Sequence, residues 1–141
     1  LPSENIRNNY DLYRNAFILW SPSMEAPVTV DTPCSSYDML PTLANLFGLP
    51  YDSRLITGKD ILSDTEKIVL INTLGSGGSW NWITSEGTYN TVDGSFTPSP
   101  QNTMTEEEKA AYVDLTQRRV AAMRKYSFEI LDRNYYSYIF K

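Results

Sequence analysis

Residues 35–49 constrain the fold of this chain more than any other stretch, because they carry the marks of a short helix with a clear start and end. Apolar side chains recur there at spacings of three and four residues, which is the pattern of one helix face: Leu40, Leu43, Leu46 and Phe47. Gly48 ends the helix, since glycine accepts the left-handed conformation found at helix ends. Pro50 prevents continuation. We predict a helix over residues 38–47, with this apolar face against the core.

The start of this helix follows from Pro41, which is harmless only in the first turn, where its missing N–H has no partner to lose. That position favours Asp38 as the N-cap, with its carboxylate accepting an early backbone N–H. Ser35 or Ser36 is the alternative cap, for a slightly longer and kinked helix.

Two extended segments are predicted before the helix. Residues 16–20 form a continuous apolar run of strand length, which is typical of a strand buried on both faces at the centre of an α/β sheet. Residues 27–32 place Val28 and Val30 between polar neighbours, which indicates a short half-buried strand or an extended connector. The first half of the chain is therefore predicted to be α/β with a three-layer tendency.

The order of these motifs resembles the C-terminal part of the sulfatase family, within the alkaline-phosphatase-like superfamily, and most closely the lipoteichoic acid synthase-like phosphoglycerol transferases. The resemblance runs from about Tyr10 to Leu62 and is weaker beyond. It rests on Ala16-Phe17-Ile18-Leu19-Trp20 with Ser21-Pro22, then Asp38-x-x-Pro41-Thr42-Leu43-x-x-Leu46-x-Gly48, then Gly58-Lys59-Asp60-Ile61-Leu62. Each motif alone is modest, and the ordered set is more specific.

This resemblance implies a parent enzyme that transfers or hydrolyses phosphate or sulfate esters, with phosphoglycerol transfer in cell-envelope polymer synthesis as the implied reaction. It implies a divalent metal (Mn, Mg or Ca), a Thr, Ser or modified Cys nucleophile, and a membrane-anchored protein acting on the extracellular face of a bacterial membrane. The family's metal ligands and nucleophile lie upstream of the matching region, and no residue here corresponds to them. We therefore expect no catalytic, cofactor-binding or metal-binding residue in this chain. Its expected partners are the upstream catalytic portion of the same protein or, in isolation, other copies of itself.

The second half is predicted to be α+β. Strands are expected at residues 68–71, 79–85, 88–92 and 95–97, with hairpin turns at Glu86-Gly87 and Asp93-Gly94. Thr105 and Glu108 form a capping box that opens a helix reaching about Asp132. Its predicted apolar stripe comprises Tyr112, Leu115, Ala122, Met123, Tyr126 and Ile130. Residues 135–140 form a last strand or short tail, and a boundary between residues 1–64 and 65–141 is predicted at the polar break before Glu66.

Composition excludes several classes of function. The chain contains no histidine, which removes Ser-His-Asp and Cys-His catalysis. Its single cysteine, Cys34, cannot form an internal disulfide, and its place before a helix start is one where a thiolate could be stabilised. A net charge of −5 argues against a nucleic-acid partner. No apolar run approaches the roughly 20 residues of a membrane span, and no signal peptide is recognisable.

Four groups of residues have both a functional and a structural interpretation. Residues 75–78 (Gly-Ser-Gly-Gly) suggest a phosphate-binding loop or a simple connection between strands. The carboxylates Asp52, Asp60 and Asp64 suit a hard cation or solvent. Trp80 and Trp82 share a strand face, which could contact a glycan or form the core beneath the long helix. Basic pairs on that helix suggest a patch for an anionic polymer or a solvated face: Arg118-Arg119 and Arg124-Lys125. The alternative function is thus an autonomous module that binds a glycan or cell-wall polymer through its aromatic face.

Overall fold

The computed structural model describes residues 13–72 and 80–139. The chain divides into two compact units, Leu1–Val30 and Asp31–Lys141. The boundary predicted near residue 64 falls inside the second unit and stays a prediction.

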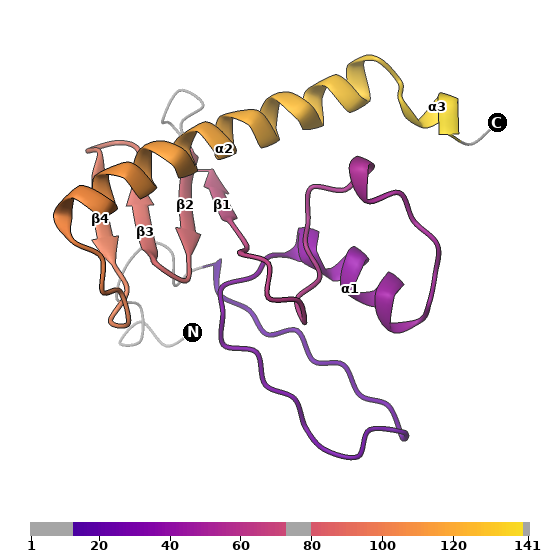
Figure 1. Cartoon of the computed structure of the whole chain (residues 1–141). Helices are drawn as coiled ribbons and strands as arrows, with labels where there is room; N and C mark the ends of the chain where they lie inside the picture. The colour runs from indigo at the N-terminus through magenta and orange to yellow at the C-terminus, as the bar shows by residue number, and fades with distance from the viewer. Residues whose placement is uncertain (1–12, 73–79, 140–141) are drawn as a thin grey trace. The chain divides into compact units, whose positions relative to one another are not determined.

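The second unit is a mixed α+β domain (Figure 1). A 3-10 turn, η3 (Ser36–Asp38), leads into the helix α1 (Met39–Leu46), and a second turn, η4 (Ser53–Leu55), follows. Four strands come next, β1 (Val69–Asn72), β2 (Trp80–Thr84), β3 (Gly87–Asn90) and β4 (Ser95–Pro98). The chain continues with the long helix α2 (Glu106–Asp132) and the short α3 (Tyr136–Ile139). The α+β class predicted for the second half is therefore confirmed, and the tail predicted at residues 135–140 begins with a short helix rather than a strand.

The four strands form one antiparallel sheet in the order β1-β2-β3-β4. All four lie within two residues of their predicted positions, although the first turn falls at Ser85 and Glu86, so that Gly87 begins β3. The register aligns one apolar residue from each strand in a single row across the sheet: Leu70, Trp82, Tyr89 and Phe96. Because side chains alternate between the faces of a strand, these four lie on the same face.

Helix α2 covers this row, crossing the sheet from β4 to β1 and continuing past β1 (Figure 1). It begins with the predicted capping box, in which Thr105 N–H donates to Glu108 Oε2 at 2.8 Å and Glu108 N–H donates to Thr105 Oγ1 at 3.3 Å. Its buried residues are Thr116, Val120 and Ile130. The predicted stripe is wrong in part, because Leu115, Ala122 and Tyr126 are exposed. A pattern restricted to large apolar side chains misses Thr116, which is fully buried.

The core centres on Trp82, which is 0% exposed and packs with Tyr89 and Val120. Its indole stacks on the Tyr89 ring with centroids 5.2 Å apart, and the Phe96 ring lies 5.8 Å away. Tyr112 from α2 meets the indole edge-on at 6.1 Å. These offset and edge-to-face contacts are the favoured arrangements of aromatic rings.

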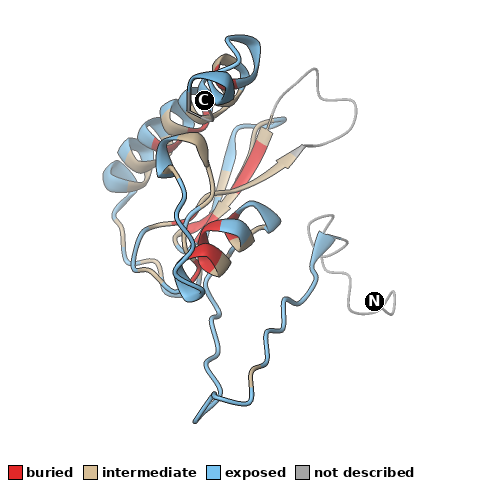
Figure 2. Ribbon diagram, turned by 90° about the vertical axis from the view of Figure 1, so that its right-hand side faces the viewer, coloured by how far each residue is buried: buried red, intermediate tan, exposed pale blue. Residues whose placement is uncertain are grey.

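The strand predicted at residues 16–20 is not formed, and residues 27–32 contain no strand, which leaves the extended connector of the two alternatives predicted there. The described part of the first unit, residues 13–30, contains no strand, and its apolar side chains are largely exposed, with Ile18 at 85% and Trp20 at 77% (Figure 2). A strand requires a neighbour to pair its N–H and C=O groups. No described segment pairs with this one, so the apolar run has neither the hydrogen bonds nor the cover of a buried strand, and the three-layer α/β arrangement is not formed by the described residues.

We predict that Trp82→Ala lowers the free energy of unfolding by roughly 3–5 kcal/mol, because it removes the side chain that both α2 and the sheet enclose. Denaturant unfolding followed by circular dichroism measures the change. Trp20→Ala is the matched control and should stay within about 0.5 kcal/mol of the parent, since Trp20 is exposed. Equal effects of the two substitutions would contradict the assignment of the core.

Candidate functional site

The residues of the motif between Asp38 and Asp60 form a hydrogen-bonded cluster around a buried carboxylate. The Asp38 side chain accepts hydrogen bonds at Oδ2 from Ser35 N–H, at 2.7 Å, and from the Ser35 hydroxyl, at 3.1 Å. Its Oδ1 accepts from Lys59 N–H at 2.7 Å. Asp38 is the N-cap residue of α1 as predicted, but its carboxylate makes no bond to the first turn of the helix. The carboxylate instead joins the start of the helix to a segment 21 residues further along the chain.

Thr42 and Asn45 extend this cluster along α1. The buried Thr42 hydroxyl donates to the Asp38 carbonyl at 2.6 Å and accepts from Ile61 N–H at 2.8 Å. Asn45 Nδ2 donates to Asp60 Oδ2 at 2.7 Å. The hydrogen bond from Asn45 is the main cause that lowers the pKa of Asp60. We call this set the α1 clamp: Asp38, Thr42, Asn45, Gly58, Asp60 and the backbone of residues 59–62.

Gly58 belongs to the clamp because the backbone passes too close for a side chain. A Cβ atom at this position would lie 1.9 Å from the Tyr37 carbonyl oxygen, so any other residue forces the two segments apart. Gly48 has a separate role, since its φ of 62° is the left-handed conformation predicted for the helix end. The clamp thus gives a structural reason for the spacing of Asp38, Thr42 and Gly58.

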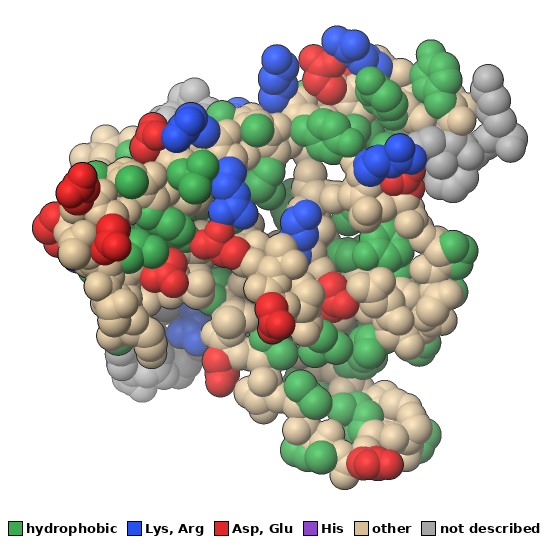
Figure 3. Space-filling model, in the orientation of Figure 1, with side chains coloured by type: hydrophobic (Ala, Val, Ile, Leu, Met, Phe, Trp, Pro, Cys, Tyr) green, Lys and Arg blue, Asp and Glu red, His purple; other side chains and the backbone are tan. Residues whose placement is uncertain are grey.

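The apolar face predicted for α1 is wrong, because the helix buries a different side. Its buried residues are Pro41, Thr42 and Ala44, whereas Leu40 is 61% and Phe47 is 66% exposed. The clamp holds the polar Thr42 side of the helix against residues 58–62, whereas on the predicted face only Leu43 is half-buried. Hydrophobic side chains are accordingly visible at the surface in Figure 3.

We predict that Thr42→Val lowers the free energy of unfolding by roughly 1–3 kcal/mol, because it keeps the side-chain shape while leaving Ile61 N–H and the Asp38 carbonyl without their partner. Hydrogen exchange at the Ile61 amide should accelerate in the same variant. Thr42→Ser retains the hydroxyl and serves as the control. An Ile61 amide that exchanges equally slowly in both variants would show that the clamp does not depend on this hydroxyl.

A second polar cluster joins the sheet, α2 and the segment before β1. The Tyr112 hydroxyl donates to Glu66 Oε1 at 2.6 Å and shares a hydrogen bond of 2.7 Å with the Thr84 hydroxyl. Arg119 forms an ion pair with the other carboxylate oxygen of Glu66. Burial first, and then the hydrogen bond to Glu66, raise the pKa of Tyr112 to about 12. We call these four residues the Tyr112 junction.

The stabilising effect of the Tyr112 hydroxyl should disappear at alkaline pH. Because the pKa is raised from 10.0 to about 12 on folding, the folded state keeps a proton that the unfolded state loses. The contribution is therefore complete below pH 10 and declines as the pH rises toward 12. Urea unfolding of the parent and of Tyr112→Phe should show a difference in free energy that is constant from pH 7 to 9 and narrows above pH 10. A difference that stays constant to pH 11.5 would contradict this.

The carboxylates considered as cation ligands lie in separate environments. Asp52 is held by Arg54, whose Nε and Nη2 donate to it at 2.9 and 2.6 Å, and this side-chain hydrogen bonding lowers the pKa of Asp52 to about 2. Asp60 belongs to the α1 clamp. Among residues 13–72 and 80–139, no group of three or more Asp, Glu, His or Cys side chains is arranged to hold a metal ion. The residues 75–78 considered as a phosphate loop lie outside the described part of the chain.

The basic residues of α2 are distributed among different partners. Arg118 pairs with Asp114 at 2.7 Å, and Arg119 pairs with Glu66. The guanidinium carbon of Arg124 lies 5.3 Å from the ring centroid of Trp80, which is a cation–π contact. In Figure 3, acidic side chains gather near the start of α2, whereas Lys and Arg side chains are scattered along the rest of it. The basic pairs therefore do not form one compact patch.

Cys34 is exposed, but its surroundings do not activate it. Partial desolvation of the thiol, followed by the nearby Asp38 carboxylate, raises the pKa of Cys34. The thiolate stabilisation predicted for this place before a helix is therefore not found, because desolvation and the Asp38 carboxylate outweigh the opposing effect of Lys67.

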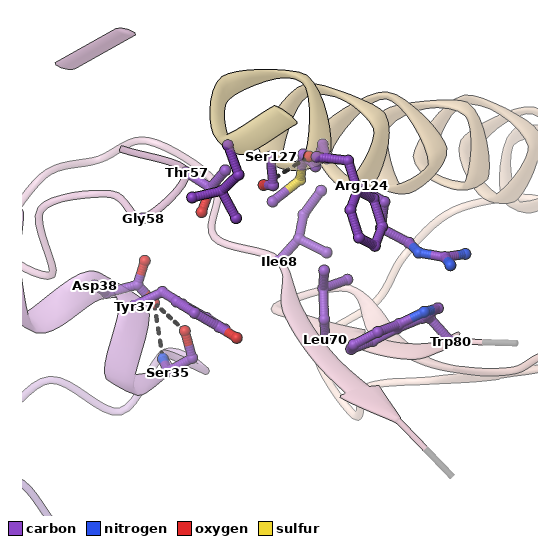
Figure 4. A pocket seen from close by; sticks show the side chains of 13 residues that line it. Ser35, Tyr37, Asp38, Thr57, Gly58, Ile68, Leu70, Trp80, Arg124 and Ser127 are labelled. Atoms are coloured by element: carbon purple, nitrogen blue, oxygen red, sulfur yellow. Dashed lines mark hydrogen bonds between the residues drawn. The ribbon is translucent and has the colours of Figure 1, made fainter. Parts of the chain in front are cut away.

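The two tryptophans of β2 have different environments. Trp82 is enclosed in the core, as the structural interpretation predicted, whereas Trp80 is half-buried and lines a groove of about 350 Å³ beside α2 (Figure 4). Ile68 and Leu70 form the adjoining wall, and Arg124 lies over the indole of Trp80. We call this the Trp80 groove. The sequence pointed to Trp80 and Arg124 separately but not to their contact, because they lie 44 positions apart.

The chain matches none of the protein-family models, curated proteins or solved structures with which it was compared. No helix among the described residues has the length and apolar character needed to cross a membrane. The geometry of the described residues therefore supports two stabilising polar clusters, an exposed apolar helix face and the Trp80 groove, beside which α2 also borders a second pocket of about 410 Å³.

Proposed function

We propose that this chain is the C-terminal, non-catalytic portion of a sulfatase-like metal-dependent enzyme that acts on phosphate or sulfate esters, with phosphoglycerol transfer in cell-envelope polymer synthesis as the implied reaction. The proposal begins with the ordered motifs at residues 16–22, 38–48 and 58–62. In this proposal the α1 clamp fixes the end of the large α/β domain, and the sheet with α2 forms a smaller appended subdomain. The metal and the nucleophile belong to the upstream portion, on the extracellular face of the membrane.

The observation that carries the proposal is the apolar surface that the described residues leave uncovered. The segment 16–20 has the composition of a central strand but no pairing partner among residues 13–72 and 80–139, and Ile18 and Trp20 are largely exposed. Helix α1 turns Leu40 and Phe47 outward. Monomeric soluble proteins rarely expose large contiguous apolar patches unless another surface meets them. An upstream α/β portion would supply both the neighbouring strands and the cover for α1.

The alternative function is a module that binds a glycan through an aromatic face. The aromatic surface available for such binding is smaller than the sequence suggested. Trp82 is fully buried, so a ligand can reach only Trp80 on that face. The uncovered surface of α1 also has no role in that alternative.

We predict that the isolated chain does not hydrolyse chromogenic phosphate or sulfate esters above a buffer blank, with manganese, magnesium or calcium added. The reason is the absence of histidine and of a residue matching the family's nucleophile. The control is the protein encoded when the reading frame is extended upstream of Leu1, which should contain a metal-binding Asp-His motif and turn over one of these esters. Turnover by the isolated chain, or an upstream frame without such a motif, would contradict the proposal.

We predict that the isolated chain self-associates and that the upstream portion, supplied as a separate polypeptide, replaces this association. Analytical ultracentrifugation measures the first effect and co-purification the second. The double variant Leu40→Lys/Phe47→Lys should weaken both self-association and binding of the upstream portion, because it places two charges on the exposed face of α1. Phe128→Lys, at a similarly exposed site on α2, is the control. A parent chain that stays monomeric at high concentration would show that the exposed face needs no partner.

A further inference from the structure

The Trp80 groove has the size and lining of a small-molecule site. Its volume of about 350 Å³ falls within the range of roughly 300–1,000 Å³ typical of ligand pockets. Its walls come from two kinds of element: Ile68 and Leu70 from the segment entering and forming β1, Trp80 from β2, and Met123 and Phe128 from α2 (Figure 4). Apolar walls drawn from a sheet and a helix suit a flat apolar ligand body.

Arg124 supplies the groove with a positive charge that has no acidic partner among the described residues. Its Nε is buried and makes no hydrogen bond within that part of the chain, whereas Arg118 and Arg119 on the same helix are both ion-paired. A buried donor without an acceptor is unfavourable, and a ligand that supplies the acceptor removes that cost. The contact with Trp80 holds the guanidinium at the edge of the groove (Figure 4).

The acidic residue that lines the same groove does not compete for Arg124. Both carboxylate oxygens of Asp38 are already occupied by hydrogen bonds from Ser35 and from Lys59 N–H. Its negative charge nevertheless disfavours a doubly charged ligand in the same space. The groove thus combines one available cation, apolar walls and a limit on the ligand's negative charge.

We propose that the Trp80 groove binds a small organic monoanion, a carboxylate attached to a flat apolar body of about the size of two fused rings. The carboxylate pairs with the guanidinium fork of Arg124, which matches its two oxygens. The apolar body lies against Trp80, Leu70 and Met123. This inference does not depend on the proposed function, since the groove is formed entirely by residues 35–131 of the second unit.

The test uses 2-naphthoate as the probe and 2-naphthamide as its uncharged counterpart. In a titration of the isotope-labelled chain followed by nuclear magnetic resonance, 2-naphthoate should shift the Arg124 Nε–Hε and Trp80 indole N–H signals saturably. The amide should bind about tenfold more weakly, because it lacks the charge. Equal affinity for the two compounds, or shifts confined to residues outside the groove, would overturn the proposal.

Arg124→Gln and Lys125→Gln form a matched pair of variants, because each removes one positive charge from α2 and only Arg124 lines the groove. Arg124→Gln should weaken 2-naphthoate binding about tenfold, and Lys125→Gln by less than about twofold. If Arg124→Gln disturbs the spectrum of the folded chain, Arg124→Lys replaces it and should weaken binding several-fold through loss of the fork. Parent-like affinity in the Arg124 variant, or equal losses in the two matched variants, would overturn the proposal.

Discussion

The burial of Trp82 between the sheet and α2 is the contact on which the second unit depends. Four strands of four or five residues make a small sheet whose stability requires a covered apolar face. A 27-residue helix likewise draws most of its stability from packing rather than from intrinsic propensity. The row of Leu70, Trp82, Tyr89 and Phe96 supplies the surface that both elements need. Each element therefore stabilises the other through the same side chains.

Hydrogen bonds from polar side chains hold segments of the chain that apolar packing alone would not fix in place. The α1 clamp satisfies backbone N–H groups of residues 59 and 61 that no strand or helix would pair. The Tyr112 junction ties the start of β1 to α2 through Glu66. Both clusters use partly or fully buried carboxylates and hydroxyls, and the loss of a hydrogen-bond partner at a buried group lowers the stability of the fold. They set the position of segments whose own apolar contacts are few.

The uncovered apolar surfaces and the Trp80 groove are different kinds of feature and lead to different inferences. Leu40 and Phe47 project from a convex helix face, which suits a large partner such as the rest of a longer protein. The groove is concave and carries a single available cation, which suits a small ligand. Either inference can therefore be right without the other. The variants that test the partner of α1 and the ligand of the Trp80 groove lie on different helices.

Much of the second unit could be predicted from the sequence, because it depends on interactions between residues close together in the chain. The capping box at Thr105, the glycine that ends α1 and the positions of all four strands follow from interactions within a few residues, and the structure confirms them. Periodicity identified α1 but not its buried side, because the clamp to residues 58–62 outweighs the leucine pattern. The same limit applies to residues 16–20, whose composition specifies a strand only if a partner strand is present. The contact of Arg124 with Trp80, and the exposure of Leu40 and Phe47, were decided by tertiary structure, because each depends on which distant segment lies beside the residue.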